Sequence, residues 1–465
     1  MKNMTLRRIT ACCGGTYFGN ESAMDTEVTG IAIDSRKVKP GGLFIPILGE
    51  RVDGHSFIPA VMEAGALACL SEKRIENPKG PYILVESTKK ALREIAAYYR
   101  RQLDIKVVGI TGSVGKTSTK EMIASVLAQK FFVHKTEGNF NNEIGLPLTV
   151  FEMTQEHEIA VLEMGISDFG EMHRLAQIAA PDICVITNIG LCHLENLGSR
   201  DGILKAKTEV FSHLQKESIV ILNGDDDKLA TVKEVNGTKP VFYTYRESPD
   251  KYVKESEAVY ATDISPLGME GIRMMLHLRG EQQTVLIPLP GEHNIYNALA
   301  AACAGDACGM KISEICRGIS AAETISGRSN LIYKDGFTII DDCYNANPVS
   351  MRASLDVLSQ ASGRKIAILG DMGELGENEK LLHAGVGSYA AEIEIDILYC
   401  TGELSREMAQ AARSVQKSHI EVFYFPDKAE LIKAVCSIIK EGDTLLVKAS
   451  HFMQFHLIVD ALEHV

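Results

Sequence analysis

The sequence contains no tryptophan, and aromatic residues make up only 6% of its 465 positions. It also lacks an apolar run of the roughly 20 residues that a membrane-spanning helix needs, so we expect no membrane insertion. Residues 1–15, MKNMTLRRITACCGG, include basic side chains but are not followed by the long apolar core of a signal peptide. These absences favour a cytoplasmic protein.

An excess of positive charge is missing too, because the formal net charge is −13. Nucleic-acid binding needs a basic face, so we expect no nucleic-acid partner. The eleven cysteines include no CxxC pair, which leaves no zinc motif. Without an export signal, these cysteines are expected to be reduced and mostly buried thiols. Anionic ligands would have to be held by local cations and backbone amides.

The chain does have the length and composition of a multidomain globular protein. Its apolar fraction is 45% and its charged fraction 23%, and 465 residues are enough for two to four domains with separate cores. Buried-type strands alternate with helical segments, which predicts α/β units with largely parallel sheets. We place the units at residues 1–103, 104–320 and 321–465.

The most informative stretch is VVGITGSVGKTSTKEM, residues 107–122. An apolar strand, a glycine loop, a lysine, two hydroxyls and a helix follow one another, which is the sequence form of a phosphate-binding loop. Lys116 would reach the β- and γ-phosphates, and the Thr117 hydroxyl would bind Mg²⁺. Ile110 stands where the common pattern has its first glycine, so the loop is a variant. The alternative is a tight glycine turn before a surface helix.

Other polar residues follow the expected strands of the same unit. Glu163 comes directly after the strand 159–162, and His193 follows the strand 183–187. Because ligands bind outside the carboxyl ends of parallel strands, both side chains are expected beside the phosphates. Oxygen ligands suit Mg²⁺, although a lone histidine or glutamate is often only structural or solvated.

Asparagines form the second group of candidates. Asn139, Asn141 and Asn142 lie in a polar loop, where they are either turn residues or ligands for a polar substrate. Asn294 and Asn297 are three residues apart near the start of a helix expected over 294–308, so they share one face. If exposed there, they could contact a base or ribose.

The flanking units offer weaker signals. Strands are expected at 29–34 and 43–48, a polar loop at 49–55, and helices at 57–66 and 88–103. Ser35 and Arg36 follow the first of these strands, where a solvated turn is the simpler reading. In the third unit, strands around 331–341, 366–369, 395–400 and 444–447 end in polar residues that include Asp342 and Lys448.

Taken together, these motifs resemble the ATP-dependent Mur ligase family of peptidoglycan synthesis over nearly the whole chain. Two motifs in the third unit are similar to the branch that adds D-alanyl-D-alanine to UDP-N-acetylmuramoyl-tripeptide. The segments that carry the resemblance are Asp34-Ser35-Arg36, TGSVGKTSTKEM (111–122), GNFNNEIGLPLT (138–149), LEMG (162–165), TNIGLCHLE (187–195), AKTEVF (206–211), GEHNIYNALAA (291–301), DDCYNANPVSM (341–351) and GDMGELG (370–376).

The resemblance implies an α/β fold with three-domain Mur ligase architecture. The expected order is a UDP-substrate-binding domain, a central P-loop parallel-sheet domain that binds ATP, and a Rossmann-like C-terminal domain. The implied reaction passes through an acyl phosphate and gives UDP-MurNAc-pentapeptide, ADP and phosphate. A monomer is expected, and the third residue of the peptide, lysine or diaminopimelate, is left open.

The resemblance also implies roles for individual residues, including two Mg²⁺ ions. Thr117 and Glu163 would bind the first ion and His193 the second, while Lys207 matches a carbamylated lysine that supports the second ion. The expected ATP contacts are Gly112, Ser113, Val114, Gly115, Lys116, Thr117, Ser118, Asn294, Asn297, Arg328 and Asp342. The expected substrate contacts are Ser35 and Arg36 with the loop 49–55 at the UDP end, and Asn139, Asn141 and Asn142 along the muramoyl-peptide.

One segment departs from the family pattern, and two other functions compete. His451 follows Lys448-Ala449-Ser450 where the family often has arginine, so the dipeptide pocket is less firmly assigned. The same chemistry could serve another amine acceptor, as in amino-acid addition or folate polyglutamylation. A P-loop switch protein is the third possibility, but the Asn-Lys-x-Asp motif that reads guanine is missing.

Overall fold

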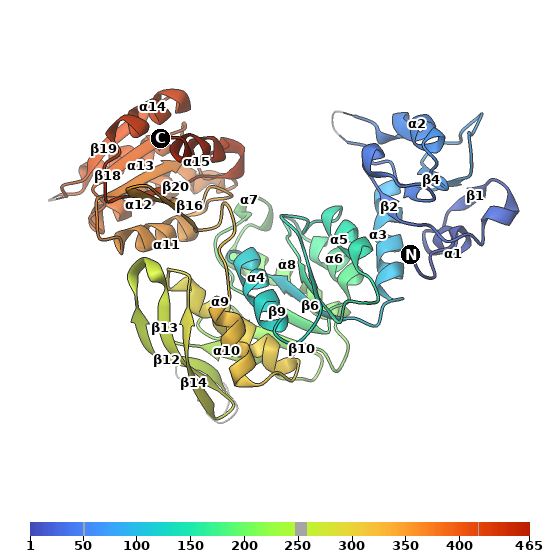
Figure 1. Ribbon diagram of the computed structural model, residues 1–465, viewed down its shortest axis with the longest axis horizontal. Helices are drawn as coiled ribbons and strands as arrows, with labels where there is room; N and C mark the ends of the chain where they lie inside the picture. The colour runs from blue at the N-terminus through green and yellow to red at the C-terminus, as the bar shows by residue number, and fades with distance from the viewer. Residues whose placement is uncertain (50–51, 247–257, 417) are drawn as a thin grey trace.

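The computed structural model describes residues 1–49, 52–246, 258–416 and 418–465. Its three sheets lie within residues 16–84, 106–287 and 330–448, one in each expected unit. In Figure 1 the first unit (blue) and the third unit (red) lie on either side of the central unit. The domain bounds at 103/104 and 320/321 fall between these sheets and stay a prediction.

The first unit is a five-stranded sheet in the order β1-β5-β4-β3-β2, and only β1 runs antiparallel to its neighbour. Two expected strands, 29–34 and 43–48, pair over only two residues each. The Asp34 side chain accepts a hydrogen bond from the Arg36 amide, and this cap starts a 3-10 helix that ends the first strand early. The elements are β1 (Thr16–Phe18), β2 (Ile31–Ala32), β3 (Leu43–Phe44), β4 (Ala68–Ser71), β5 (Tyr82–Leu84), α1 (Leu6–Cys12), α2 (Ile58–Glu63) and α3 (Thr88–Arg100).

The central unit is a nine-stranded sheet in the order β14-β13-β12-β11-β10-β9-β6-β8-β7. From β7 to β12 each strand is parallel to its neighbours, whereas β12, β13 and β14 form an antiparallel meander at the edge of the sheet. Residues 247–257, which precede β12, lie outside the described residues. The strands are β6 (Lys106–Thr111), β7 (Val133–Lys135), β8 (Ile159–Glu163), β9 (Ile183–Ile186), β10 (Ile219–Asn223), β11 (Val241–Thr244), β12 (Val259–Pro266), β13 (Ile272–Leu278) and β14 (Glu281–Ile287).

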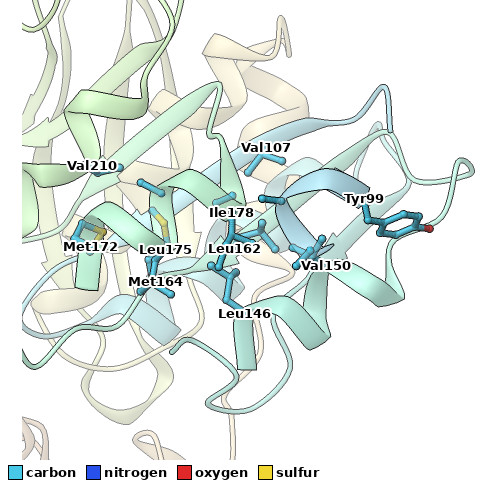
Figure 2. Packing of buried hydrophobic residues seen from close by; sticks show 14 of the residues in the cluster. Tyr99, Val107, Leu146, Val150, Leu162, Met164, Met172, Leu175, Ile178 and Val210 are labelled. Carbon is cyan, nitrogen blue, oxygen red and sulfur yellow. The ribbon is translucent and has the colours of Figure 1, made fainter. Parts of the chain in front are cut away.

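Helices cover both faces of this sheet, as parallel strands require. On one face, α4, α9 and α10 pack in a single core, and α9 is rich in buried alanines that allow close approach to α4. On the other face, α3 of the first unit packs against α5 and α6, so the two units share a core. Figure 2 shows this shared core, with Tyr99 of α3 beside Val150 of α5. The helices are α4 (Lys116–Leu127), α5 (Gly145–Glu152), α6 (Glu171–Ala179), α7 (Leu194–Leu197), α8 (Arg200–Thr208), α9 (His293–Ala307) and α10 (Ile312–Ser320).

The third unit is a six-stranded sheet in the order β15-β16-β20-β17-β18-β19. Only the edge strand β15 is antiparallel, which confirms a largely parallel sheet. No helix within the described part of the chain is long and apolar enough to cross a membrane. The elements are β15 (Asn330–Lys334), β16 (Phe337–Asp341), β17 (Lys365–Gly370), β18 (Ile397–Thr401), β19 (Glu421–Phe425), β20 (Asp443–Lys448), α11 (Pro348–Ser359), α12 (Glu379–Glu392), α13 (Ser405–Ser414), α14 (Lys428–Ile438) and α15 (His456–Glu463).

Candidate active site

The phosphate loop lies between β6 and α4, as the sequence predicts. Gly112 has φ +152°, and a Cβ there would lie 1.9 Å from the Thr187 hydroxyl, so only glycine fits. Gly115 has φ +78° and occupies the N-cap of α4. Among the described residues, none caps this helix with its side chain, and its first turn holds no acidic residue. A helix N-terminus of this kind favours a bound anion.

The segment after β9 holds the loop in shape. The Val114 amide donates to Asn188 Oδ1 at 3.0 Å, and Asn188 Nδ2 donates back to the Val114 carbonyl at 3.0 Å. Lys116 Nζ donates to the Gly112 carbonyl at 2.9 Å, so the ammonium folds over its own loop. Sequence reasoning gave Asn188 no role, although its place directly after a strand was a usable signal.

A cavity of about 530 Å³ opens in front of this loop, between the central and third units. It brings together most of the residues that the sequence nominates, and they come from the two units. Five nominated residues do not line it: Gly112, Lys207, Asn294, Ser35 and Arg36. Those that do are Ser113, Val114, Gly115, Lys116, Thr117, Ser118, Asn139, Asn141, Asn142, Glu163, His193, Asn297, Arg328 and Asp342.

Glu163 is the last residue of β8 and is buried, with 1% of its surface exposed. Asn141 Nδ2 donates to Glu163 Oε1 at 2.7 Å, whereas Oε2 has no hydrogen-bond partner among the described residues. A buried carboxylate oxygen without a partner is costly unless a cation or donor arrives. This oxygen therefore fits a divalent cation between the sheet and the phosphates.

His193 begins α7 with a left-handed backbone, φ +51°. Its Nδ1 lies 2.6 Å from Oε2 of Glu374, a residue of the third unit. The hydrogen bond from His193 lowers the pKa of the Glu374 carboxyl. Glu374 is part of the motif GDMGELG (370–376), to which the sequence analysis assigned no residue role.

Lys207 lies in α8 and is 1% exposed, whereas its neighbour Lys205 is exposed. Burial, and then the charge of Lys116, lower the pKa of Lys207 to about 7. Lys207 is therefore not a solvated side chain on the helix surface. A large fraction of this amine is unprotonated at neutral pH and can act as a nucleophile.

Asn294 and Asn297 do share one face of α9, but that face is not exposed, as contact with a base or ribose would require. Each is 4% exposed because α9 packs this face against α4. Thr119 donates to Asn297 Oδ1 at 2.8 Å, Asn297 donates to Asn294 Oδ1 at 2.8 Å, and Asn294 donates to the Pro290 carbonyl at 2.9 Å. The pair ties the two helices together at the edge of the cavity.

In the third unit, Asp342 follows β16 and forms a buried ion pair. Lys448 Nζ lies 2.6 Å from Asp342 Oδ2, and the amide of Ser329 donates to Oδ1 at 3.1 Å. The guanidinium of Arg328 lies 4.0 Å from the centre of the Tyr344 ring. His451 is exposed and its ring centre is 5.6 Å from that of Tyr344. All of these residues except His451 line the cavity on the side of the third unit.

A second cavity, of about 720 Å³, lies between the first and central units. Asp34 and Lys37 line it, but Ser35 and Arg36 do not, and Arg36 is an exposed side chain paired with Asp34 at 2.8 Å. Glu50 and Arg51 of the expected loop 49–55 lie outside the described residues. Asn139 and Asn142 line both cavities. One asparagine loop therefore borders the two sites.

The described residues contain no group of three or more His, Cys, Asp or Glu side chains arranged to hold a metal ion. An all-protein metal cage is therefore missing from this part of the structure. Mg²⁺ commonly uses one or two protein ligands together with phosphates and waters. Thr117 and Glu163 on the walls of one cavity match that sparser pattern.

Three family descriptions match successive parts of the chain. The Mur ligase family catalytic domain matches residues 27–100, the Mur ligase middle domain matches residues 110–305, and the Mur ligase glutamate ligase domain matches residues 327–451. The matches cover most of the three units described above.

Individual relatives match over nearly their whole length. The chain is 38% identical to UDP-N-acetylmuramoyl-tripeptide--D-alanyl-D-alanine ligase of Bacillus subtilis (strain 168), over 99% of both chains. It is similar to a crystal structure of MurF from Acinetobacter baumannii, with 32% identity, a TM-score of 0.89 and 99% coverage of both chains. It is also similar to the MurF ligase from Thermotoga maritima in complex with ADP, with 29% identity, a TM-score of 0.82, and coverage of 94% of this chain and 97% of that one.

Proposed function

This chain belongs to the Mur ligase family, and we propose on that premise that it is an ATP-dependent peptide ligase. The reaction joins the terminal carboxylate of UDP-N-acetylmuramoyl-tripeptide to the amine of D-alanyl-D-alanine, giving UDP-MurNAc-pentapeptide, ADP and phosphate. The main support for this proposal is one cavity that has the phosphate loop on one wall. Its other wall holds Arg328, Asp342 and Lys448 of the third unit. The Bacillus subtilis relative, 38% identical over 99% of this chain, carries the name of this activity.

The chemistry divides between positioning and charge stabilisation. The γ-phosphate passes to the tripeptide carboxylate, and the amine of the dipeptide then displaces phosphate from the acyl phosphate. Lys116 and the amides at the start of α4 hold the β- and γ-phosphates and stabilise the charge that develops during transfer. The third unit brings the acceptor to the same cavity and excludes water from it.

Mg²⁺ would be held by Thr117 and Glu163, and a second ion by His193. The fit rests on the buried Glu163 Oε2, which has no hydrogen-bond partner among the described residues and is suited to bind a cation. When bound, Mg²⁺ neutralises phosphate charge and orients the triphosphate. Asn141 holds Glu163 Oε1, so the carboxylate is presented in one orientation.

Lys207 is proposed as the carbamylated lysine. Its buried amine has a pKa of about 7, so it is substantially unprotonated under neutral conditions. The neutral amine nitrogen would add to the carbon of CO₂ and release one proton, which leaves an anionic carbamate in place of the neutral amine. An anion at this buried position offsets the repulsion from Lys116 and supports the second Mg²⁺.

The substrates would run along the walls of the two cavities. Asn139 and Asn142 border both, which suits a muramoyl-peptide that passes from the first unit to the phosphate loop. Ser35 and Arg36 remain proposed for the UDP end, and Asn294 and Asn297 for the adenine side of ATP. The dipeptide would lie near Lys448 and His451. We propose that the enzyme acts as a monomer in the cytoplasm.

The test is acceptor-dependent phosphate release in a buffer with Mg²⁺ and bicarbonate. The wild-type chain is expected to release phosphate only when UDP-N-acetylmuramoyl-tripeptide and D-alanyl-D-alanine are both present. Single amino acids, and folate with glutamate, serve as competing acceptors. Turnover with one of these and none with the dipeptide would replace the proposal with another ligase. Tight binding of GTP in preference to ATP would favour a switch protein instead.

A further inference from the structure

The contact between His193 and Glu374 joins two units that are far apart in sequence. His193 lines the cavity in front of the phosphate loop, and Glu374 lies in the loop after β17 of the third unit. The two side chains meet with His193 Nδ1 2.6 Å from Glu374 Oε2. The catalytic scheme above uses His193 and leaves Glu374 without a function.

Both partners have a left-handed backbone, φ +51° at His193 and φ +60° at Glu374. Such a conformation costs a residue other than glycine roughly 1 kcal/mol or more, and glycine would remove that cost. A histidine and a glutamate that carry this cost on both sides of one contact point to a role for their side chains.

The loop that presents Glu374 is fixed on three sides. The amide of Met372 donates to His383 Nε2 at 2.9 Å, and the amide of Gly373 donates to the Ser450 hydroxyl at 2.9 Å. The Ser450 amide donates to the Asp371 carbonyl at 3.0 Å. The position of Glu374 is therefore set by the body of the third unit and moves with it.

A histidine that binds a metal usually donates its other ring N–H to a carboxylate, which fixes the tautomer and the ring orientation. Here Nδ1 faces the carboxylate, so Nε2 is the nitrogen left for a metal. We propose that Glu374 is the positioning residue for His193, and that docking of the third unit orients this imidazole for the second metal ion. The inference rests on the proposed function, because that function makes His193 a metal ligand.

This arrangement couples two events that the reaction needs together. When the third unit is docked, Glu374 accepts a hydrogen bond from Nδ1–H, which turns Nε2 toward the metal. When the third unit is away, the imidazole loses its partner and both tautomers become populated. The metal site would then be complete only while the acceptor-binding unit covers the cavity, which limits wasteful hydrolysis of ATP.

The test uses the full-length chain with a non-hydrolysable ATP analogue and Mn²⁺ as the probe, counted by the EPR signal of the free ion. Glu374→Ala is expected to weaken one of two Mn²⁺ sites about tenfold, within the range for lost partners of metal ligands. Glu374→Gln keeps an acceptor for Nδ1–H and is expected to restore part of the affinity. Glu377→Gln is the matched control. Glu377 is exposed and lies three residues from Glu374, and the substitution removes the same charge.

Two further readouts separate positioning from folding. ¹⁵N spectra of histidine-labelled protein, with His193→Gln to identify the signal, are expected to show an Nδ1–H tautomer that is lost in Glu374→Ala. Glu374→Gly is expected to melt at or above the wild-type temperature while binding Mn²⁺ as weakly as Glu374→Ala, since glycine relieves the backbone. Unchanged Mn²⁺ affinity and an unchanged tautomer in Glu374→Ala would overturn the inference, and loss of phosphate release in the wild type would instead overturn the proposed function.

Discussion

Asn141 and Glu163 are joined by a hydrogen bond of 2.7 Å between the asparagine loop and the end of β8. The bond fixes one oxygen of a buried carboxylate that lines the nucleotide cavity, and the other oxygen has no hydrogen-bond partner among the described residues. A residue that the sequence assigned to substrate contact is thus also the neighbour that orients the proposed Mg²⁺ ligand.

Asn141→Ala is therefore expected to act on the metal and not only on the peptide substrate. Loss of the donor leaves the Glu163 carboxylate unpaired and free to turn, and we expect a 10- to 100-fold loss in apparent Mg²⁺ affinity. Phosphate release measured against Mg²⁺ concentration checks this. Asn139→Ala, in the same loop, is the control. A changed KM for the peptide substrate with unchanged Mg²⁺ dependence would contradict the role given to Asn141.

The Lys207 carbamate predicts a dependence on both CO₂ and pH. With a pKa of about 7, the reactive free amine falls to about one tenth of the total at pH 6. Activity in CO₂-depleted buffer is expected to drop, and more steeply at pH 6 than at pH 8. A ¹³C carbamate signal from labelled bicarbonate, present in wild type and in the exposed-site control Lys205→Met but missing in Lys207→Met, provides the direct measurement.

The same shift has a consequence for stability. The unfolded lysine keeps its proton up to its ordinary pKa of 10.5, whereas the folded one releases it near 7, so unfolded Lys207 binds more protons between these values. The contribution of Lys207 to the free energy of unfolding of the wild type therefore rises with pH from about 7 to about 10.5. Burial of this lysine destabilises the folded state most below pH 7, where the amine is charged. Urea unfolding of CO₂-free wild type and Lys207→Met across this window is expected to show the difference shrinking as pH rises.

Asn294→Ala is expected to destabilise the central unit, because it leaves the Asn297 amide without its acceptor between two packed helices. An unpaired buried amide costs about 1–3 kcal/mol. Hydrogen exchange of amides in α4 and α9 measures the loss, and ADP affinity is measured in parallel. Reduced ADP affinity with unchanged protection would mean that Asn294 contacts the nucleotide and has no role in packing.

Sequence alone located the phosphate loop and its neighbours because their positions follow from local patterns. Glu163 ends a strand next to β6 in a parallel sheet, so its proximity to Lys116 follows from strand order and the shared direction of the chain. The side that Asn294 faces does not follow from spacing, since only the packing of α4 against α9 decides which face is buried. Contacts between units, such as His193 with Glu374, depend on how whole domains dock, and no local pattern encodes that.

The ion pair between Lys448 and Asp342 is expected to stabilise the fold of the third unit. Lys448→Met leaves the buried Asp342 carboxylate without its counter-charge, which costs about 3 kcal/mol or more. Asp342→Asn on top of Lys448→Met is expected to restore part of the loss. Hydrogen exchange of the amides in β16 and β20 measures this loss of stability. Lys440→Met, at an exposed position, serves as the control. Equal protection in Lys448→Met and wild type would contradict a stabilising pair.

The central claim is that ATP activates the tripeptide carboxylate as an acyl phosphate before the dipeptide amine attacks. The most direct measurement labels both oxygens of that carboxylate with ¹⁸O and follows them by mass spectrometry. Transfer of one ¹⁸O into inorganic phosphate, with the other retained in the new amide, is the result that this account predicts. Amide formation with unlabelled phosphate would contradict it.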